Sequence, residues 1–276
     1  MTGSHNVARR LPSESPLPVF DLGLAPYGPL QALQGHLRQA VAEGSLPGVL
    51  LLLEHEAVIT LGSRGTDGDL RLDAGSDSGP SLERDPGRVQ DRHVALAPLS
   101  TEEPKPGLGI SSFPAPIPVV RSERGGQATL HAPGQLVSYP VVPVPGRDLG
   151  RYVHDLEECL IAVLSGYAIH AERRTHHPGL YVRGEKIASV GLRCQRWVAS
   201  HGTSLNVDID LTLFDSIVSC GEAELRQTSM QSLLGVPPAM SEVKEAYCRA
   251  VDDVFGWQLA PMRQVAFSQV EPELGL

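Results

Sequence analysis

The chain has 276 residues, enough for one large domain or two small ones. Hydrophobic residues make up 41% of it and charged residues 20%, which is ordinary for a globular protein with a buried core. Its 23 Lys and Arg residues against 32 Asp and Glu residues give a net charge of −9, which argues against a general nucleic-acid binder. No apolar run approaches the roughly 20 residues that a membrane-spanning helix needs, so we expect no membrane partner.

The spacing of the cysteines and the N-terminal residues indicate the cellular compartment in which the protein works. The four cysteines, at positions 159, 194, 220 and 248, form no C-x-x-C pair and no zinc-site spacing, so the sequence predicts neither a metal site nor a bound cofactor. Free thiols of this kind suit a reducing cytosol. The first residues, "MTGSHNVARRLPSESP", lack the apolar stretch of a signal peptide. We therefore expect a cytoplasmic protein.

In chain order, the first regular pattern covers residues 29–43. Leu30, Leu33, Leu37 and Val41 share one face of that stretch, which predicts an amphipathic helix that stops at the glycine after it. The next stretch, "GVLLLLEHEAVITLG", predicts a buried strand, a short turn and a second strand.

From about residue 64 to residue 118 the composition changes to Gly, Ser, Asp and Pro with no apolar period. We interpret these residues as a long, partly disordered insertion inside one domain. An interdomain linker is the alternative, but the following segment is too rich in strands to begin an independent unit. The predicted domain therefore spans residues 18–258, with tails at 1–17 and 259–276.

The second half alternates between strand and helix patterns. "QLVSYPVVPV" predicts a strand, residues 151–165 a helix, and "GLYVRGEKIASVGLRCQRWVASHGTSLNV" a series of strands with tight turns. Ser241 is placed to cap a last helix that ends at Gly256. Few helices and many strands indicate an α/β or α+β fold, with a mixed, largely antiparallel sheet and flanking helices.

The stretch "RGGQATLHAPGQ", residues 124–135, is a glycine-rich loop after the β-like run "PIPVV". A P-loop would follow its last glycine with Lys and Ser or Thr, but Gln135 and Leu136 follow here. A dinucleotide fingerprint would open a helix, and this stretch has no helical pattern. The glycines permit close backbone approach, and Arg124 and His131 offer polar groups. Such a loop could hold an acyl chain, a carbonyl or a phosphate, or be a simple turn.

Cys220 differs from the other three cysteines. Cys159, Cys194 and Cys248 fall within regular helix or strand patterns, where a free thiol behaves as a small core residue. Cys220 precedes a glycine and two acidic residues and belongs to no periodic face. A thiol needs a nearby cation or base to be a potent nucleophile, and Lys186 in "GEKIASVG" is a candidate. An idle surface thiol and a solvated turn lysine are the alternatives, and spacing alone does not bring the two residues together.

Four segments together resemble the lipoyl(octanoyl) transferase family. "RGGQATLHAPGQLVSYP" is similar to the family's R-G-G-x-x-T-x-H-G-P-G-Q block, and "IVSCGEAELRQTSM" to its I-x-P-C-G segment. "GLYVRGEKIASVGLRCQRWVASHGTSLNVDIDLTLF" is similar to the block with K-I-A-x-[IV]-G and H-G-x-[AS]-L-N-V, and "EHEAVITLG" to the E-H-x-x-x-[YI]-T-L-G strand. The resemblance covers residues 18–235 apart from the insertion. It implies the fold of the biotin/lipoate protein ligase catalytic domain.

The resemblance also implies the reaction and its residues. Family members move an octanoyl group from acyl carrier protein to a lysine of a lipoyl domain, the first step of endogenous protein lipoylation. Carried onto this chain, Cys220 is the nucleophile that forms an acyl-thioester, and Lys186 activates it and acts as general acid and base. His201 is interpreted as fixing its loop, and His176 and His177 as surface residues. The implied substrate-binding residues are Arg124, Gly125, Gly126, Gln127, Ala128, Thr129, Leu130, His131, Ser189, Val190, Gly191, Gly202, Thr203 and Ser204.

The implied partners are octanoyl-acyl carrier protein as donor and, as acceptors, the lipoyl domains of 2-oxoacid dehydrogenase complexes and the glycine cleavage H protein. These partners are typically acidic, so a local basic patch is expected beside the pocket. Its predicted members are Arg124, Arg147, Arg151, Arg173 and Arg174. Two other functions stay open: an ATP-dependent lipoate or biotin ligase on the same scaffold, and a non-catalytic protein that binds acyl groups or lipoyl domains.

Overall fold

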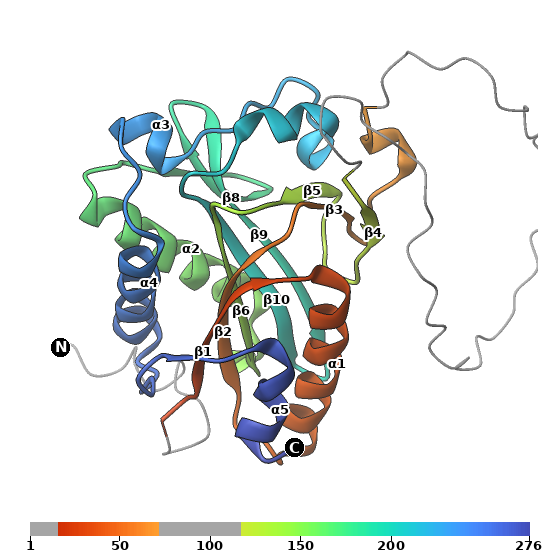
Figure 1. Ribbon diagram of the computed structural model, residues 1–276, viewed down its shortest axis with the longest axis vertical. Helices are drawn as coiled ribbons and strands as arrows, with labels where there is room; N and C mark the ends of the chain where they lie inside the picture. Colours follow the sequence, from red (N-terminus) through yellow and green to blue (C-terminus); the bar gives the residue numbers. More distant parts are fainter. Residues whose placement is uncertain (1–15, 72–116) are drawn as a thin grey trace, which may run out of the picture.

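The computed structural model describes residues 16–71 and 117–276 (Figure 1). The N-terminal tail and most of the predicted insertion thus lie outside the described residues. In the two described ranges no helix is long and apolar enough to cross a membrane. The longer helices are α1 (Tyr27–Glu43), α2 (Leu149–Gly166) and α4 (Met240–Phe255), and the shorter ones are α3 (Met230–Leu234) and α5 (Val270–Leu274).

The strands form two sheets. The larger has the order β11-β1-β2-β6-β10-β9-β8-β7 and the smaller the order β4-β3-β5. Their bounds are β1 (Val19–Ala25), β2 (Val49–His55), β3 (Val58–Leu61), β4 (Val119–Arg121), β5 (Ala128–His131), β6 (Gln135–Pro143), β7 (Glu172–Arg174), β8 (His177–Val182), β9 (Glu185–Gln195), β10 (Val198–Asn206) and β11 (Arg263–Gln264).

Both sheets are mixed, and most of their strand pairs are antiparallel. Strands β6, β10, β9, β8 and β7 form a continuous antiparallel run, and β2 pairs antiparallel with β6. Strands β1 and β2 are parallel because α1 carries the chain back between them, as a crossover connection must. The predicted fold class is therefore confirmed.

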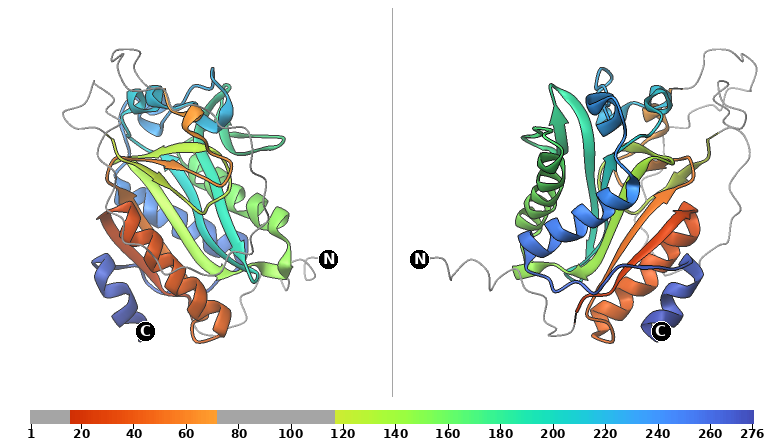
Figure 2. Two further views of the ribbon diagram at one scale, coloured as in Figure 1. Left: turned by 90° about the vertical axis from the view of Figure 1, so that its right-hand side faces the viewer. Right: turned by 60° about the vertical axis from the view of Figure 1, so that its left-hand side comes forward.

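Successive side chains of the central strands point to opposite faces of the large sheet and pack into two separate hydrophobic cores. In β2, Leu50 and Leu52 pack under α2 and α4, whereas Leu51 and Leu53 pack under α1. This division follows from the period of two in a strand, and it explains why the run "VLLLL" is buried on both faces. Figure 2 shows the result as three layers, with α2 and α4 on one side of the sheet and α1 and α5 on the other.

The predicted helices match α1, α2 and α4 closely, but one predicted cap is wrong. Helix α4 begins two residues earlier than expected, with Ala239 at the N-cap and no side-chain hydrogen bond there. Ser241 lies inside the first turn instead. The other end is as predicted, because Gly256 takes the left-handed conformation that ends the helix.

The predicted insertion begins too early. Residues 64–71 are folded: a 3-10 turn, η2 (Asp67–Asp69), is closed by a capping box from Thr66, and Leu70 packs against the small sheet. Ile117 joins the same apolar cluster from the other side. Both ends of the predicted insertion, residues 64–71 and 117–118, therefore belong to the folded domain. Residues 72–116 lie outside the described part of the chain.

The C-terminal residues are part of the domain rather than a tail. Strand β11 pairs in parallel with β1 and forms one edge of the large sheet. Helix α5 follows, and its Val270 is fully buried in the core that also holds α1. The predicted domain end at residue 258 is corrected by these contacts, which join residues 259–276 to the sheet.

Candidate active site

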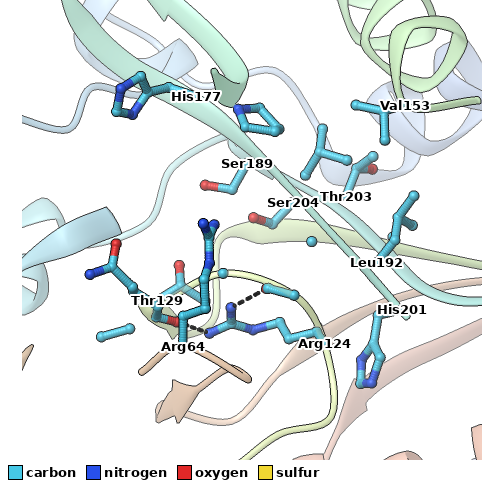
Figure 3. A pocket seen from close by; sticks show the side chains of 18 of the residues that line it. Arg64, Arg124, Thr129, Val153, His177, Ser189, Leu192, His201, Thr203 and Ser204 are labelled. Carbon is cyan, nitrogen blue, oxygen red and sulfur yellow. Dashed lines mark hydrogen bonds between the residues drawn. The ribbon is translucent and has the colours of Figure 1, made fainter. Parts of the chain in front are cut away.

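A cavity of about 350 Å³ opens between strands β9 and β10 and the glycine loop before β5 (Figure 3). Buried side chains form one end of the cavity and exposed ones the other, and Figure 3 shows His201 and His177 on opposite sides of it. Helix α2 adds two apolar side chains near its N-terminus, Leu149 and Val153. The cavity is thus a pocket with a closed, buried end and an open mouth.

The glycine loop is held to the pocket by its backbone. The Gly125 N–H donates to the Leu192 carbonyl of β9 at 2.8 Å, and the Arg64 N–H donates to the Gly126 carbonyl at 3.0 Å. Gly126 has a φ of +93°, which favours glycine. A Cβ added at Gly191 would lie 3.3 Å from Arg124 Cδ, so the strand needs a glycine where the loop crosses it.

Arg124 clamps this loop from inside. Its buried guanidinium donates to the Thr60 carbonyl at 2.7 Å and to the Gln127 carbonyl at 2.8 Å. It also donates to the Gly125 carbonyl at 3.0 Å. Arg124 therefore ties the loop to β3 while it lines the pocket, and much of its hydrogen-bonding capacity serves the fold.

Thirteen of the fourteen predicted substrate-binding residues line the cavity. The exception is Leu130, which is fully buried in the apolar cluster under the small sheet. Successive side chains of a strand point to opposite faces, so Thr129 and His131 face the cavity while Leu130 faces the core. The residues that do line it are Arg124, Gly125, Gly126, Gln127, Ala128, Thr129, His131, Ser189, Val190, Gly191, Gly202, Thr203 and Ser204.

Lys186 lines the same pocket and is 2% exposed. Its ammonium donates to the Pro178 carbonyl at 3.2 Å and lies 5.5 Å from the centre of the Tyr181 ring. Its backbone exchanges hydrogen bonds of 2.9 Å with Arg226 and Thr228. The lysine is therefore an amine inside the pocket wall, not a solvated turn residue, and the chain just after Cys220 is fastened to it.

The backbone of Cys220 lies in a 3-10 turn, η5 (Ser219–Gly221), and its side chain lies outside what the structure describes. Two contacts bring this turn to the pocket. A Cβ added at Gly221 would overlap the Gln127 side chain of the glycine loop. The Glu222 carboxylate lies 2.9 Å from Nδ1 of His177, a residue of the pocket mouth. The Cys220 turn thus contacts two residues that line the same cavity as Lys186.

The other three cysteines lie in or against the main core. Cys159 is fully buried under α4, and burial raises the pKa of its thiol well above the usual range. Burial also raises the pKa of Cys248, to about 11, and that of Cys194. These thiols stay protonated near neutral pH and are poor nucleophiles, as the sequence predicts for core cysteines.

Residues that the sequence does not assign to the pocket complete both of its ends. Tyr139 and His201 join His131 at the buried end, and burial lowers the pKa of His201 to about 3, so its ring is neutral. His201 has a φ of +57° within β10, and its N–H donates to Gln34 of α1 at 2.7 Å. The sequence predicts that His201 fixes its loop, and this prediction does not include a place for His201 in the pocket.

The mouth is formed by residues that are exposed or half-buried. His176 and His177 are exposed, as the sequence predicts, and they also line this mouth. Arg64, just after β3, reaches the mouth from the start of the predicted insertion. The sequence around each of these residues does not predict a place in the pocket, because the mouth combines segments that are far apart in the chain.

The predicted basic patch is largely neutralised. Arg124 is buried, and three of the other arginines pair with carboxylates, of which Asp155 and Glu157 are themselves buried. These pairs are Arg151 with Asp155 at 2.9 Å, Arg173 with Glu157 at 2.9 Å and with Glu158 at 2.8 Å, and Arg174 with Glu222 at 3.6 Å. The expectation of a free cationic surface is therefore wrong for these residues. Across residues 16–71 and 117–276, no cluster of three His, Cys, Asp or Glu side chains could hold a metal ion.

Solved structures share the fold at low sequence identity. A lipoate-protein ligase A bound with ATP superposes with a TM-score of 0.63 at 13% identity, over 94% of this chain and 92% of that one. A lipoate protein ligase from Thermoplasma acidophilum, described with its E2 lipoyl domain, gives 0.61 at 12% identity over 94% and 91%. At this identity the likeness concerns the fold alone.

Sequence relatives identify the family. The lipoyl protein ligase A/B catalytic domain matches residues 113–252. An octanoyltransferase of Rubrobacter xylanophilus is 35% identical over 85% of this chain and 91% of its own length, and one of Nitratidesulfovibrio vulgaris is 36% identical over 86% and 94%. One of Ectopseudomonas mendocina is 44% identical over 52% and 71%. The resemblance drawn from the sequence is confirmed, and the chain belongs to the octanoyltransferase family of acyltransferases.

Proposed function

We propose that the protein takes an octanoyl group from acyl carrier protein onto Cys220 as a thioester and passes it to a lysine of a lipoyl domain. Lys186 donates a proton in the first step and accepts one in the second. The main support is that the buried Lys186 lines a pocket whose walls include Leu149, Val153 and Leu192, and that the Cys220 turn contacts two other residues of its lining. The surface that these walls present to the cavity is mostly apolar, which suits a medium-length acyl chain.

The first step is exchange of one thioester for another. The Cys220 thiolate attacks the acyl carbon, a new carbon–sulfur bond forms, and the bond to the carrier sulfur breaks. The departing thiolate takes a proton from the Lys186 ammonium, which becomes a neutral amine. Two thioesters are similar in free energy, so this step needs no nucleotide.

The second step forms the amide. The amine of the acceptor lysine attacks the acyl carbon, a carbon–nitrogen bond forms, and the bond to Cys220 sulfur breaks. The neutral Lys186 accepts the proton that the attacking amine loses, which restores the ammonium beside a thiolate. Aminolysis of a thioester is downhill, so the cycle runs without ATP.

The acceptors we propose are lipoyl domains of 2-oxoacid dehydrogenase complexes and the glycine cleavage H protein. Support for lipoyl-domain acceptors comes from the family and from the Thermoplasma ligase described with its E2 lipoyl domain. We assign the reaction to the cytoplasm, since an exchange chemistry based on a free thiol suits a reducing compartment.

The test is intact-protein mass spectrometry after mixing the enzyme with octanoyl-acyl carrier protein in the absence of ATP. The wild type should gain one octanoyl group, localised to Cys220 by peptide mapping, and lose it when an apo lipoyl domain is added. Cys220→Ala should gain none. The matched control is Cys248→Ser, which removes another thiol from a half-buried helix position and should acylate normally.

Three results would contradict this proposal. Normal transfer by Cys220→Ala would exclude the thioester intermediate. Transfer that requires ATP and free octanoate and releases pyrophosphate would favour the ligase alternative. Stable binding of the octanoyl carrier protein or the lipoyl domain without any turnover would favour the non-catalytic alternative.

A further inference from the structure

The closed end of the pocket is polar although the walls leading to it are largely apolar. His131, Tyr139 and His201 line it and are each less than 7% exposed. The terminal methyl of a plain acyl chain offers these groups no hydrogen bond. The protonation of each ring therefore determines what this end of the pocket can bind.

A chain of hydrogen bonds fixes the proton on His131. The Asn206 amide nitrogen donates to the Thr228 carbonyl at 2.9 Å, so its oxygen is an acceptor. That oxygen accepts from the Gln135 amide nitrogen at 2.9 Å, which leaves the Gln135 oxygen as an acceptor too. His131 must then donate to it through Nδ1–H, at 2.6 Å. Burial lowers the pKa of His131 well below its usual value, so the ring is neutral and Nε2 carries a lone pair.

A second chain fixes the proton on Tyr139. Nδ1 of His55 donates to the Ala25 carbonyl at 2.8 Å, and burial lowers the His55 pKa to about 4. Nε2 of His55 is therefore unprotonated and accepts the Tyr139 hydroxyl proton at 2.8 Å. The only hydroxyl proton of Tyr139 is thus donated to His55, and the Tyr139 oxygen can act toward the pocket only as a hydrogen-bond acceptor.

The two acceptors belong to one cluster. The His55 ring, to which Tyr139 is hydrogen-bonded, lies 5.5 Å from the His131 ring between centroids. His201 packs edge-on against Tyr139 at 5.9 Å, and within the described ranges its buried Nδ1 has no hydrogen-bond partner. The closed end thus gathers lone pairs on the Tyr139 oxygen and on His131 Nε2 beside one buried ring nitrogen, His201 Nδ1, that has no partner among the described residues. Leaving such a buried nitrogen unpaired is costly unless a bound molecule pairs with it.

We propose that the closed end of the pocket is a subsite for a hydrogen-bond donor at the far end of the acyl chain. The substrate class that fits is a medium-chain acyl thioester with a terminal hydroxyl. Its hydroxyl donates to the Tyr139 oxygen or to His131 Nε2 while the methylene chain fills the apolar part. This inference rests on the proposed acyl transfer and adds a preference at the end of the pocket far from the reacting carbon.

The test compares three thioesters on the same carrier protein: octanoyl, 8-hydroxyoctanoyl and nonanoyl. The last two have equal numbers of non-hydrogen atoms and differ only in a hydroxyl against a methyl group. We expect the wild type to have about tenfold higher kcat/KM for 8-hydroxyoctanoyl than for nonanoyl, the usual effect of one well-made hydrogen bond. Tyr139→Phe and His131→Phe each remove one acceptor and should lower this ratio several-fold.

The ratio separates recognition from damage, because a variant that is merely misfolded loses both substrates alike. Using two variants keeps the test decisive if one of them does not fold, as judged by thermal melting. A wild-type ratio of one or less, with normal octanoyl transfer, would overturn the subsite and indicate an ordered water there instead. A ratio unchanged in folded variants would also overturn it. Loss of transfer from all three thioesters would instead count against the proposed function.

Discussion

At the scale of single residues, the described part of the chain contains two buried lysines in contrasting surroundings. Lys186 is in the pocket wall and donates to a backbone carbonyl. Lys244 of α4 is equally buried but pairs with Asp21 of β1 at 2.6 Å, away from the pocket. We propose that the first serves the chemistry, whereas the second holds a helix to the sheet, so their substitutions should have opposite effects on activity and stability.

Lys186→Met should lower the single-turnover rate of octanoyl transfer by about 10²–10⁴-fold, the range for loss of a general acid–base group. Its melting temperature should change little, since a thioether tolerates an apolar site. Lys244→Met should do the reverse, because Asp21 is left as a partly buried charge without its partner, while transfer at low temperature persists. Similar kinetics for the two variants would rule out the role of Lys186.

The neutral histidines at the closed end predict an acid-sensitive fold. Burial lowers the pKa of His55 to about 4 and that of His201 to about 3, against 6.5 when exposed. Below pH 6.5 the unfolded chain therefore binds protons that the folded chain does not, and stability falls as the pH drops toward 4. Each histidine should cost about 2 kcal/mol between pH 6.5 and pH 5.

Urea unfolding at several pH values checks this. The slope of unfolding free energy against pH should be positive between pH 5 and pH 6.5 and should become shallower in His55→Gln. His170→Gln, at an exposed position, is the control and should keep the wild-type slope. A wild-type slope near zero would mean that these rings take up protons in the folded state.

At the scale of elements, the hairpin of β8 and β9 positions Lys186. Gly179 begins the buried part of β8 with a φ of +124°, and a Cβ there would overlap the Ala188 carbonyl and lie 2.9 Å from Lys186 Cε. Its N–H donates to the buried carboxylate of Glu157 on α2 at 2.8 Å. The strand can approach the lysine this closely only because the residue has no side chain.

Gly179→Ala should therefore lower both stability, by at least about 2 kcal/mol, and transfer, because Lys186 is displaced. Gly35→Ala is the matched control, since a Cβ at that position of α1 meets nothing within 4 Å. It should raise stability by about 0.5–1 kcal/mol, as expected for replacing a helix glycine. Thermal melts and single-turnover assays on both variants check the pair. Equal behaviour of the two would contradict the packing argument.

The spacing of apolar residues is enough to predict most helices and strands, but it does not predict which residues each side chain contacts. Helices α1 and α2 and strands β8 to β10 follow from apolar spacing alone. β11 is only two residues long, so its pairing with β1 has no sequence pattern to reveal it. The misassignment of Leu130 has a different cause: a matched block names consecutive residues, whereas a strand sends alternate ones to opposite faces.

The pocket illustrates the same limit. The glycine loop and Lys186 are identifiable because compact motifs surround them. Tyr139 and His201 are not, because they face the pocket only through the way β6 and β10 pair. At His201 the backbone has a left-handed φ of +57°, and its N–H donates to the Gln34 side chain of α1 rather than to a strand.

At the scale of the whole molecule, the pocket and the C-terminal residues lie in different parts of the sheet. The residues that line the pocket end at Ser204, whereas β11 covers the far edge at β1 and α5 buries Val270 beneath α1. Stability at that edge should therefore be separable from catalysis.

Removing residues 263–276 should lower the melting temperature by several degrees, because it exposes the edge of β1 and uncovers an apolar contact worth about 1.5–3 kcal/mol. Transfer per folded molecule, measured by single turnover well below the melting temperature, should be unchanged. Circular dichroism melts provide the first measurement. A truncated protein that melts normally but has lost transfer would show that this segment serves the pocket after all.

The walls of the pocket are drawn from residues as far apart as Arg64 and Ser204, and the turn with Cys220 comes later still. No shorter stretch of the chain contains both the residues that line the cavity and the proposed nucleophile, Cys220. During synthesis on the ribosome, a nascent chain therefore cannot capture an acyl carrier until β10 and the cysteine turn have both emerged. Prematurely terminated products should then be inert, and they would not sequester octanoyl groups from the complete enzyme.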